Sequence, residues 1–157
     1  MEVIPIMNPK QKQSIARAIL EDLTDWFGLE ESREEYIEQA AHLPFLCAME
    51  DQQPVGFLCL KQTGKDTAEI QVMGVLQDRH GHGIGKALVD QARRMARKMG
   101  CSFLQVKTVQ MGKYPEYDAT NRFYLAMGFG EFEVFPNLWD PWNPCQIYVL
   151  SLKDPKN

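Results

Sequence analysis

A glycine-rich segment between a predicted strand and a predicted helix carries the clearest chemical signal in the sequence. Gly81, Gly83 and Gly85 alternate with other residues, directly after an apolar strand predicted over 68–76. Such a turn directs several peptide N–H groups toward one point, and the positive end of the following helix dipole reinforces them. Glycines let the backbone come close to a ligand because they carry no β-carbon. The segment therefore predicts a binding site for phosphate groups.

Two common phosphate-binding motifs do not fit the spacing of these glycines. A Walker A loop has four residues between its glycines and ends in Lys-Ser/Thr, whereas three residues separate Gly81 from Gly85 and Ala87 follows Lys86. The dinucleotide fingerprint GxGxxG also fails, and it would require an acid about twenty residues further on. The next predicted strand ends instead in Lys107-Thr108-Val109. Neither a P-loop nor a dinucleotide-binding fold is predicted.

The same segment resembles the acetyl-CoA loop of the GNAT superfamily of N-acetyltransferases, which reads Gln/Arg-x-x-Gly-x-Gly/Ala. Aligned on Gly83 and Gly85, the first position of that pattern falls on His80. Residues 120–129 are similar to the second family signature, Ala-x-x-Phe/Leu-Tyr-x-x-x-Gly-Phe, with Thr120 at the alanine position. The order of elements resembles that of the family over nearly the whole chain. The resemblance implies one acetyltransferase domain over 1–157, with acetyl-CoA as cosubstrate.

The resemblance also implies which residues meet the cosubstrate. The loop would hold the pyrophosphate mainly through backbone amides, with Lys86 as a further phosphate contact. Backbone groups on the preceding strand would pair with the pantetheine arm, as if a strand were being added, and one of their N–H groups would meet the oxyanion. Asn121 would hydrogen-bond the pantetheine, with an exposed polar residue of the helix as the alternative role. The expected cosubstrate-binding residues are Met73, Gly74, Val75, His80, Gly81, His82, Gly83, Ile84, Gly85, Lys86 and Asn121.

Acetyl transfer from a thioester to an amine requires positioning, stabilisation of an oxyanion and two proton movements. Tyr124 falls on the tyrosine position of the family signature, which implies a general acid for the departing thiolate. Its alternative role is that of an aromatic core residue. Glu69 resembles the strand residue that supplies the general base in histone-acetylating members, acting through a water. Its alternative role is that of a strand carboxylate paired with a surface base.

The acceptor site is usually framed, in this fold, by the first two helices and the loop between the last two strands. These segments correspond to 26–29 and 137–144, where Trp26 and Trp139 are the expected substrate-binding residues. Their rings suit stacking or cation–π contact with a ligand. A small diffusible amine, an antibiotic amine and a protein N-terminus or lysine all stay open as acceptors. The alternative function is a catalytically weak acyl-CoA-binding module that regulates a partner.

Charge is distributed unevenly along the 157 residues, whose formal net charge is −4. Residues 21–38 hold eight acids and one arginine, a net charge of −7, whereas residues 79–98 hold six bases and one acid, a net charge of +5. The acidic balance argues against a general nucleic-acid binder. The distribution suggests an anionic cosubstrate at the basic run and a cationic amine at the acidic run. Solvated helix faces are the alternative interpretation of both runs.

Several motifs that the sequence lacks bear on metal binding, cellular compartment and membrane association. The four cysteines form no CxxC pair and the three histidines have no matching cluster, so no structural zinc site is expected. Three of the cysteines lie in apolar stretches, as small core residues do, and together with the absence of a signal-peptide pattern this favours the cytoplasm. No apolar run approaches the ~18 residues of a membrane helix, so no membrane partner is expected. The resemblance leaves a homodimer open.

Alternating strand and helix patterns must position these residues. Strands are predicted over 3–7, 45–49, 55–60, 68–76, 102–109, 129–135 and 146–152, and helices from 9 to about 26 and over 32–42, 83–99 and 118–127. A capping box at 32–35 opens the second of these helices. The predicted core stripe of the third helix is Ile84, Leu88, Ala92, Met95 and Met99. The order is β-α-α-β-β-β-α-β-α-β-β, which predicts an α/β (α+β) fold with a GNAT-like mixed central sheet and helices on both faces. The unit over 68–109 needs a right-handed crossover, so its two strands should be parallel neighbours.

Overall fold

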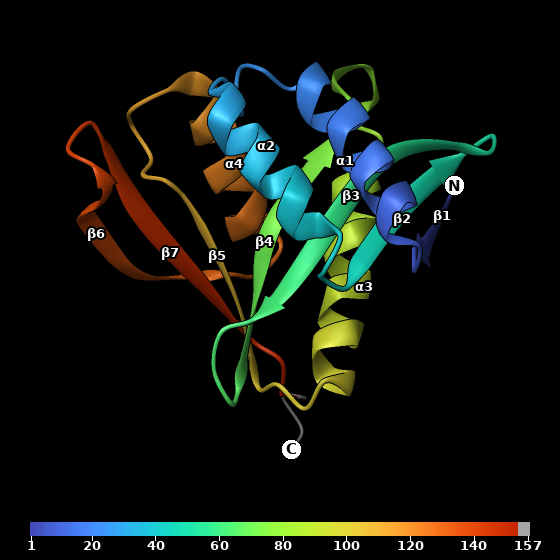
Figure 1. The fold of residues 1–157 in the computed structure, drawn as a ribbon. Coiled ribbons are helices and arrows are strands. Elements are labelled where there is room, and N and C mark those ends of the chain that lie inside the picture. Colours follow the sequence, from blue (N-terminus) through green and yellow to red (C-terminus); the bar gives the residue numbers. More distant parts are fainter. Residues whose placement is uncertain (154–157) are drawn as a thin grey trace. The chain divides into compact units, whose positions relative to one another are not determined.

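The computed structural model describes residues 1–153, and its elements follow the predicted order with one added 3-10 turn (Figure 1). The elements are β1 (Glu2–Pro5), α1 (Pro9–Asp22), α2 (Glu30–Ala40), β2 (Phe45–Glu50), β3 (Gln53–Gln62), β4 (Thr67–Val75), η1 (Gln77–Arg79), α3 (Ile84–Lys98), β5 (Phe103–Val109), α4 (Pro115–Ala126), β6 (Gly130–Asp140) and β7 (Asn143–Ser151). The strand order in the seven-stranded sheet is β1-β2-β3-β4-β5-β7-β6. Adjacent β4 and β5 agree with the predicted crossover unit. The predicted fold class is therefore confirmed.

The chain forms two compact units, Met1–Lys61 with Ile70–Met95, and Gln62–Glu69 with Ala96–Asn157. Strand β4 and helix α3 each contribute to both units. None of the helices in the described part of the chain has the length and apolarity that crossing a bilayer requires. The expectation of one domain stays a prediction.

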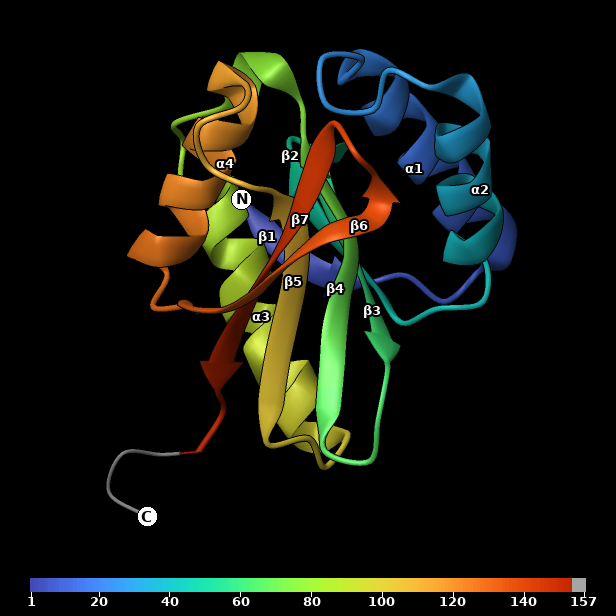
Figure 2. The same cartoon turned by 90° about the vertical axis from the view of Figure 1, so that its left-hand side faces the viewer.

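In the first unit, helices cover both faces of the strands. A Cβ on Gly74 of β4 would lie 2.8 Å from Leu23 Cδ1 of α1. A Cβ on Gly56 of β3 would instead lie 3.1 Å from Ile84 Cγ2 and 3.2 Å from Leu88 Cδ1 of α3. Helix α1 thus packs on one face and α3 on the other, while α2 lies beside α1 (Figures 1 and 2). The predicted helices on both faces are confirmed here, and Gly74 is glycine because α1 packs directly against the strand.

In the second unit, β7 pairs antiparallel with both β5 and β6 (Figure 2). Side chains alternate between faces along a strand, so Gln105 and Lys107 share one face, and Cys145 of β7 lies opposite Val109 on that same face. Leu104 and Val106 point to the other face, together with Tyr148 of β7. Helix α4 packs on this second face, since its Tyr124 ring lies 6.3 Å from the Tyr148 ring.

Three predicted boundaries were wrong. Helix α2 begins at Glu30, after the N-cap Leu29, so Ser32 lies inside the helix and forms no capping box. Helix α1 ends at Asp22 rather than near residue 26, because the peptide N–H groups of Trp26 and Phe27 bond back to Leu23 O in tight turns. Helix α4 begins at Pro115 rather than Asp118, and proline is favoured at a first helical position because its missing N–H is not needed there.

The expected loop over 137–144 is mostly strand. Strand β6 continues to Asp140 and β7 starts at Asn143, so only two residues separate them. Asp140 closes this turn, because its Oδ1 accepts hydrogen bonds from the peptide N–H groups of Trp142 and Asn143, each at 2.9 Å. The hydrogen bond from the Asn143 side chain contributes most to holding the pKa of Asp140 below its ordinary value, and the two peptide N–H groups lower that pKa further. A two-residue turn closed by a carboxylate therefore replaces the loop expected over 137–144.

Candidate active site

The glycine turn before α3 has the geometry of an anion-binding loop. Gly81 and Gly83 adopt φ angles of +82° and +80°, which L-residues rarely adopt. No described atom lies within 4 Å of where a Cβ would stand at either position, so conformation rather than crowding requires glycine there. The first peptide N–H of this segment to donate a hydrogen bond within it is that of Ala87, which donates to Gly83 O at 3.1 Å. The N–H groups of residues 81–86 donate to no carbonyl in the described turns, loops and caps.

This arrangement fits a phosphate-bearing ligand. Open space above the two glycines and free peptide N–H groups at the start of a fifteen-residue helix are what an anion requires. Lys86 lies in the first turn and is largely exposed, with its Nζ 3.2 Å from Asp90 Oδ2. An exposed pair of this kind is weak, so the ammonium group can turn toward a phosphate. The contact of Lys86 with a ligand stays a prediction.

His80 links the loop to the end of β4. Its Nε2 lies 2.7 Å from Val75 O, and its ring meets that of Trp26 edge-on with centroids 5.6 Å apart. Trp26 itself is partly buried and packs against the core formed by α1, α2, β2 and β3. His80 thus occupies a structural position in the loop. Substrate contact by Trp26 stays a prediction.

The segment Met73–Val75 supplies the end of β4 that was expected to meet the pantetheine arm. Gly74 faces α1, with Leu23 and Ile19 close to it, as described above. The Leu76 N–H donates to Val55 O at 2.9 Å, and the Val75 carbonyl accepts from His80. The Val75 carbonyl is therefore already in use in this structure, whereas the role of the Met73 and Gly74 backbone stays a prediction.

Tyr124 is buried on α4 among aromatic rings, yet its hydroxyl has no hydrogen-bond partner among residues 1–153. Its ring centroid lies 5.3 Å from Phe123, 5.4 Å from Phe129 and 6.3 Å from Tyr148. No fully buried side-chain nitrogen or oxygen in the described part of the chain lacks a partner, so the Tyr124 oxygen must reach the surface. Burial raises the pKa of Tyr124 above its ordinary value, which keeps the phenol protonated. The residue combines a packed ring with a free proton donor.

Asn121, one turn before Tyr124, is fully buried and engaged with protein groups. Its Nδ2 donates to Val109 O at 2.8 Å and to Tyr117 O at 2.7 Å. Its Oδ1 accepts from the Tyr148 hydroxyl at 2.6 Å. Asn121 therefore joins α4 to β5 and β7, which positions the helix that carries Tyr124. Its expected contact with the cosubstrate stays a prediction.

Glu69 lies on β4 in the second unit and is 6% exposed. Its Oε1 lies 2.9 Å from Lys107 Nζ and accepts a hydrogen bond from Gln105 Nε2 at 3.2 Å. The base role and the paired-carboxylate role proposed from sequence are thus compatible, because Oε1 accepts a hydrogen bond from Gln105 while Oε2 accepts none from residues 1–153. Sequence reasoning singled out neither Lys107 nor Gln105, although their alternate positions on β5 place both on one face of the strand.

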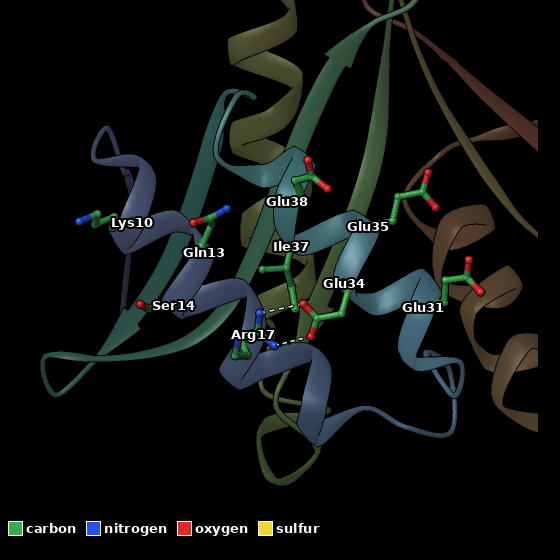
Figure 3. A pocket seen from close by; sticks show the side chains of 9 residues that line it. All are labelled: Lys10, Gln13, Ser14, Arg17, Glu31, Glu34, Glu35, Ile37 and Glu38. Carbon is green, nitrogen blue, oxygen red and sulfur yellow. Dashed lines mark hydrogen bonds and ion pairs between the residues drawn. The ribbon is translucent and has the colours of Figure 1, made fainter.

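Two further features bear on an acceptor. Trp139 on β6 is 46% exposed, so part of the residue is accessible from solvent. Between α1 and α2 lies a groove of about 800 Å³ lined by charged side chains (Figure 3). Its lining residues are Lys10, Gln13, Ser14, Arg17, Glu31, Glu34, Glu35, Ile37 and Glu38.

Only one carboxylate of this groove is neutralised by a neighbour. Arg17 contacts Glu34 through two hydrogen bonds, at 2.5 and 2.8 Å, which hold the pKa of Glu34 below its ordinary value (Figure 3). Glu31, Glu35 and Glu38 form no ion pair within residues 1–153. The part of the acidic run that lies on α2 is therefore a solvated, largely unpaired face of that helix.

Comparison with solved structures places the fold among acetyltransferases. A protein from Desulfovibrio desulfuricans described as a GNAT-family acetyltransferase superposes with a TM-score of 0.85 at 21% identity, over 97% of this chain and 99% of that one. The aminoglycoside 6'-N-acetyltransferase from Enterococcus faecium gives 0.79 at 17% identity, with 100% of each chain covered. An aminoglycoside 6'-N-acetyltransferase complexed with coenzyme A gives 0.79 at 19% identity, also over 100% of each chain.

Sequence comparison gives the family directly. No match was found among curated protein sequences. The family model for the acetyltransferase (GNAT) family matches residues 13–129, which include Glu69, the glycine loop and Tyr124. This match confirms the predicted class of acetyl-CoA-dependent N-acetyltransferase. The chain therefore belongs to the acetyltransferase (GNAT) family.

Proposed function

We propose that this enzyme transfers the acetyl group of acetyl-CoA directly to the primary amine of a small cationic acceptor. The observation that carries the proposal is the unpaired acidic face of α2, where Glu31, Glu35 and Glu38 line the groove of Figure 3. Unpaired carboxylates on one face attract cations and raise their local concentration. Two structural neighbours are aminoglycoside acetyltransferases, whose acceptors carry several amines, and this supports the same charge class.

Residues of this chain bind acetyl-CoA and move the two protons in the proposed reaction. The loop at 80–86 binds the pyrophosphate through its peptide N–H groups, and the backbone of β4 near Gly74 orients the pantetheine arm. Bound acetyl-CoA supplies the thioester. Glu69 accepts the proton that the acceptor amine loses, through one water. As the amine nitrogen bonds to the carbonyl carbon and the C–S bond breaks, Tyr124 gives its phenolic proton to the departing sulfur. Trp139 offers a ring face to the acceptor.

Thiol release from acetyl-CoA over an amine panel tests this proposal. The panel contains polycationic amines such as aminoglycosides, singly charged amines, amino acids and basic peptides, with matched uncharged amides as blanks. We expect the highest kcat/KM for small polycationic amines, falling as salt is raised from low ionic strength. Equal rates for weakly and highly charged amines, or a kcat/KM that salt does not lower, would contradict the cationic acceptor.

A charge variant with a matched control sharpens the result. Replacing Glu35 and Glu38 with glutamine removes two carboxylates from the groove, whereas Glu2→Gln with Asp51→Asn removes two exposed carboxylates elsewhere. We expect the first variant to lose at least about threefold in kcat/KM at low salt, because two attractive charges are gone. The control should keep the parent value, and both should converge at high salt. Equal losses in the two variants would reduce the effect to net charge and contradict a role of α2.

A further inference from the structure

The two donors that contact Glu69 both bind the same oxygen. Lys107 Nζ lies 2.9 Å from Oε1, and Gln105 Nε2 lies 3.2 Å from Oε1. Oε2 accepts no hydrogen bond from residues 1–153. The carboxylate is therefore held asymmetrically, because Oε1 is hydrogen-bonded to the protein and Oε2 is not.

The uncommitted oxygen reaches the surface of the unit although the residue is buried. The side chain of Glu69 is 8% exposed. In the described part of the chain no fully buried side-chain nitrogen or oxygen lacks a partner. Since Oε2 has no partner, the exposed area must include it. A single oxygen that meets solvent is where a water or an amine can hydrogen-bond.

The two donors are themselves fixed by strand β5. Gln105 and Lys107 are two residues apart, so they project from the same face of the strand. The Gln105 amide also donates to Thr63 Oγ1 at 3.3 Å, which ties it to the turn between β3 and β4. The Lys107 side chain is 32% exposed and spans the gap to Glu69. Cys145 on β7 also interacts electrostatically with Lys107 and Glu69, and its thiol is buried.

We propose that Lys107 and Gln105 are positioning residues, which hold Glu69 by Oε1 and thereby aim Oε2 at the water that takes the proton of the acceptor amine. The inference rests on the proposed function of Glu69 as general base. A base held in one orientation avoids the loss of reactive geometry that a freely rotating carboxylate suffers. Removing the grip should lower kcat while leaving the KM for acetyl-CoA nearly unchanged, since neither donor is assigned to the cosubstrate.

A double-mutant cycle tests the inference. The variants are Glu69→Gln, Lys107→Met, their combination, and Lys107→Arg, with Lys65→Met as a control that removes an exposed lysine of the same unit. We expect Glu69→Gln to lower kcat by about 10²–10⁴. Lys107→Met should lower kcat at least about tenfold, and Lys107→Arg should restore most of it because its guanidinium keeps both charge and donor. In the Glu69→Gln background, Lys107→Met should change kcat by less than about twofold.

Each outcome separates the two claims. If Glu69→Gln keeps the parent kcat, the base role fails and the positioning role falls with it. If Glu69→Gln loses turnover and Lys107→Met lowers kcat equally in both backgrounds, or not at all, the positioning role is overturned while the base role stands. Lys65→Met should match the parent throughout.

Folding does not obscure the result. Lys107→Met alone leaves a buried carboxylate without its cation and can unfold the protein, whereas the double variant leaves no unpaired buried charge. Gln105→Met supplies an independent arm, because it removes a neutral donor from the same oxygen and keeps the ion pair. We expect it to lower kcat about two- to tenfold in the parent and not in the Glu69→Gln background. Equal losses in the two backgrounds would overturn the positioning role of Gln105.

Discussion

Tyr124 and Tyr148 lie near each other in the second unit with their rings tilted by 35°, and only one of their hydroxyls is hydrogen-bonded to the described part of the protein. The Tyr148 hydroxyl donates to Asn121 Oδ1 at 2.6 Å, whereas the Tyr124 hydroxyl has no partner among residues 1–153. Replacing each tyrosine with phenylalanine therefore removes the same atom with opposite expected consequences. The pair separates a role in catalysis from a role in folding.

The magnitudes follow from these contacts. Tyr148→Phe leaves the buried Asn121 oxygen without a donor, which costs about 1–3 kcal/mol of unfolding free energy. For a chain of this size that corresponds to a fall in Tm of roughly 2–4 °C per kcal/mol. Tyr124→Phe breaks no hydrogen bond to the protein, so its stability should stay within about 0.5 kcal/mol of the parent. Its turnover should fall by about 10²–10⁴, the usual contribution of a general acid.

Urea unfolding and thiol release, measured on the same preparations, check the prediction. We expect Tyr124→Phe to keep the parent unfolding free energy and the parent affinity for acetyl-CoA, with kcat lost. Tyr148→Phe should unfold earlier and keep its kcat per folded molecule. A Tyr124→Phe enzyme with parent turnover would refute the general-acid role. A Tyr124→Phe protein that is destabilised as much as Tyr148→Phe would refute the free hydroxyl.

Three further results are expected. Gly74→Ala should lower the unfolding free energy by about 1–3 kcal/mol in urea titration, because its Cβ would stand 2.8 Å from Leu23 Cδ1. Gly83→Ala should weaken acetyl-CoA binding in calorimetry, with a stability cost of about 1–2 kcal/mol from its φ of +80°. The unfolding free energy should fall as pH rises above about 8.5. Burial raises the pKa of Cys59 to about 12 and also raises that of Tyr124, so the unfolded chain releases these protons while the folded chain keeps them. An unfolding free energy that is flat from pH 8 to 10 would contradict this.

Local patterns made the loop and the helix order predictable from the sequence. Gly81 and Gly83 adopt positive φ angles, which glycine tolerates whatever the tertiary context because it has no Cβ. The stripe of α3 was partly predicted, since Ile84, Leu88 and Ala92 are buried, although Met95 and Met99 are only half-buried. Periodicity identifies the face of a helix more securely than its ends.

The missed features depend on contacts between distant segments. The pairing of Glu69 with Lys107 requires the register of β4 against β5, which no local pattern encodes. The composition of 137–144 suggests a loop, yet Asp140 closes a two-residue turn and lets both strands continue. At α2, Glu30 and Glu31 occupy the first turn, where carboxylates favour the helix dipole. The helix therefore begins two residues before the predicted cap at Ser32.

The proposed direct transfer to a cationic amine has one decisive measurement. Purified enzyme is incubated at low salt with acetyl-CoA and the amine panel, and free thiol and acetylated product are quantified together, for the parent and for Glu69→Gln. The account predicts one thiol released per acetylated amine, with polycationic acceptors preferred and with the rate reduced about 10²–10⁴ in Glu69→Gln. Acetyl-CoA that binds to the protein without acetylating any amine of the panel would contradict it.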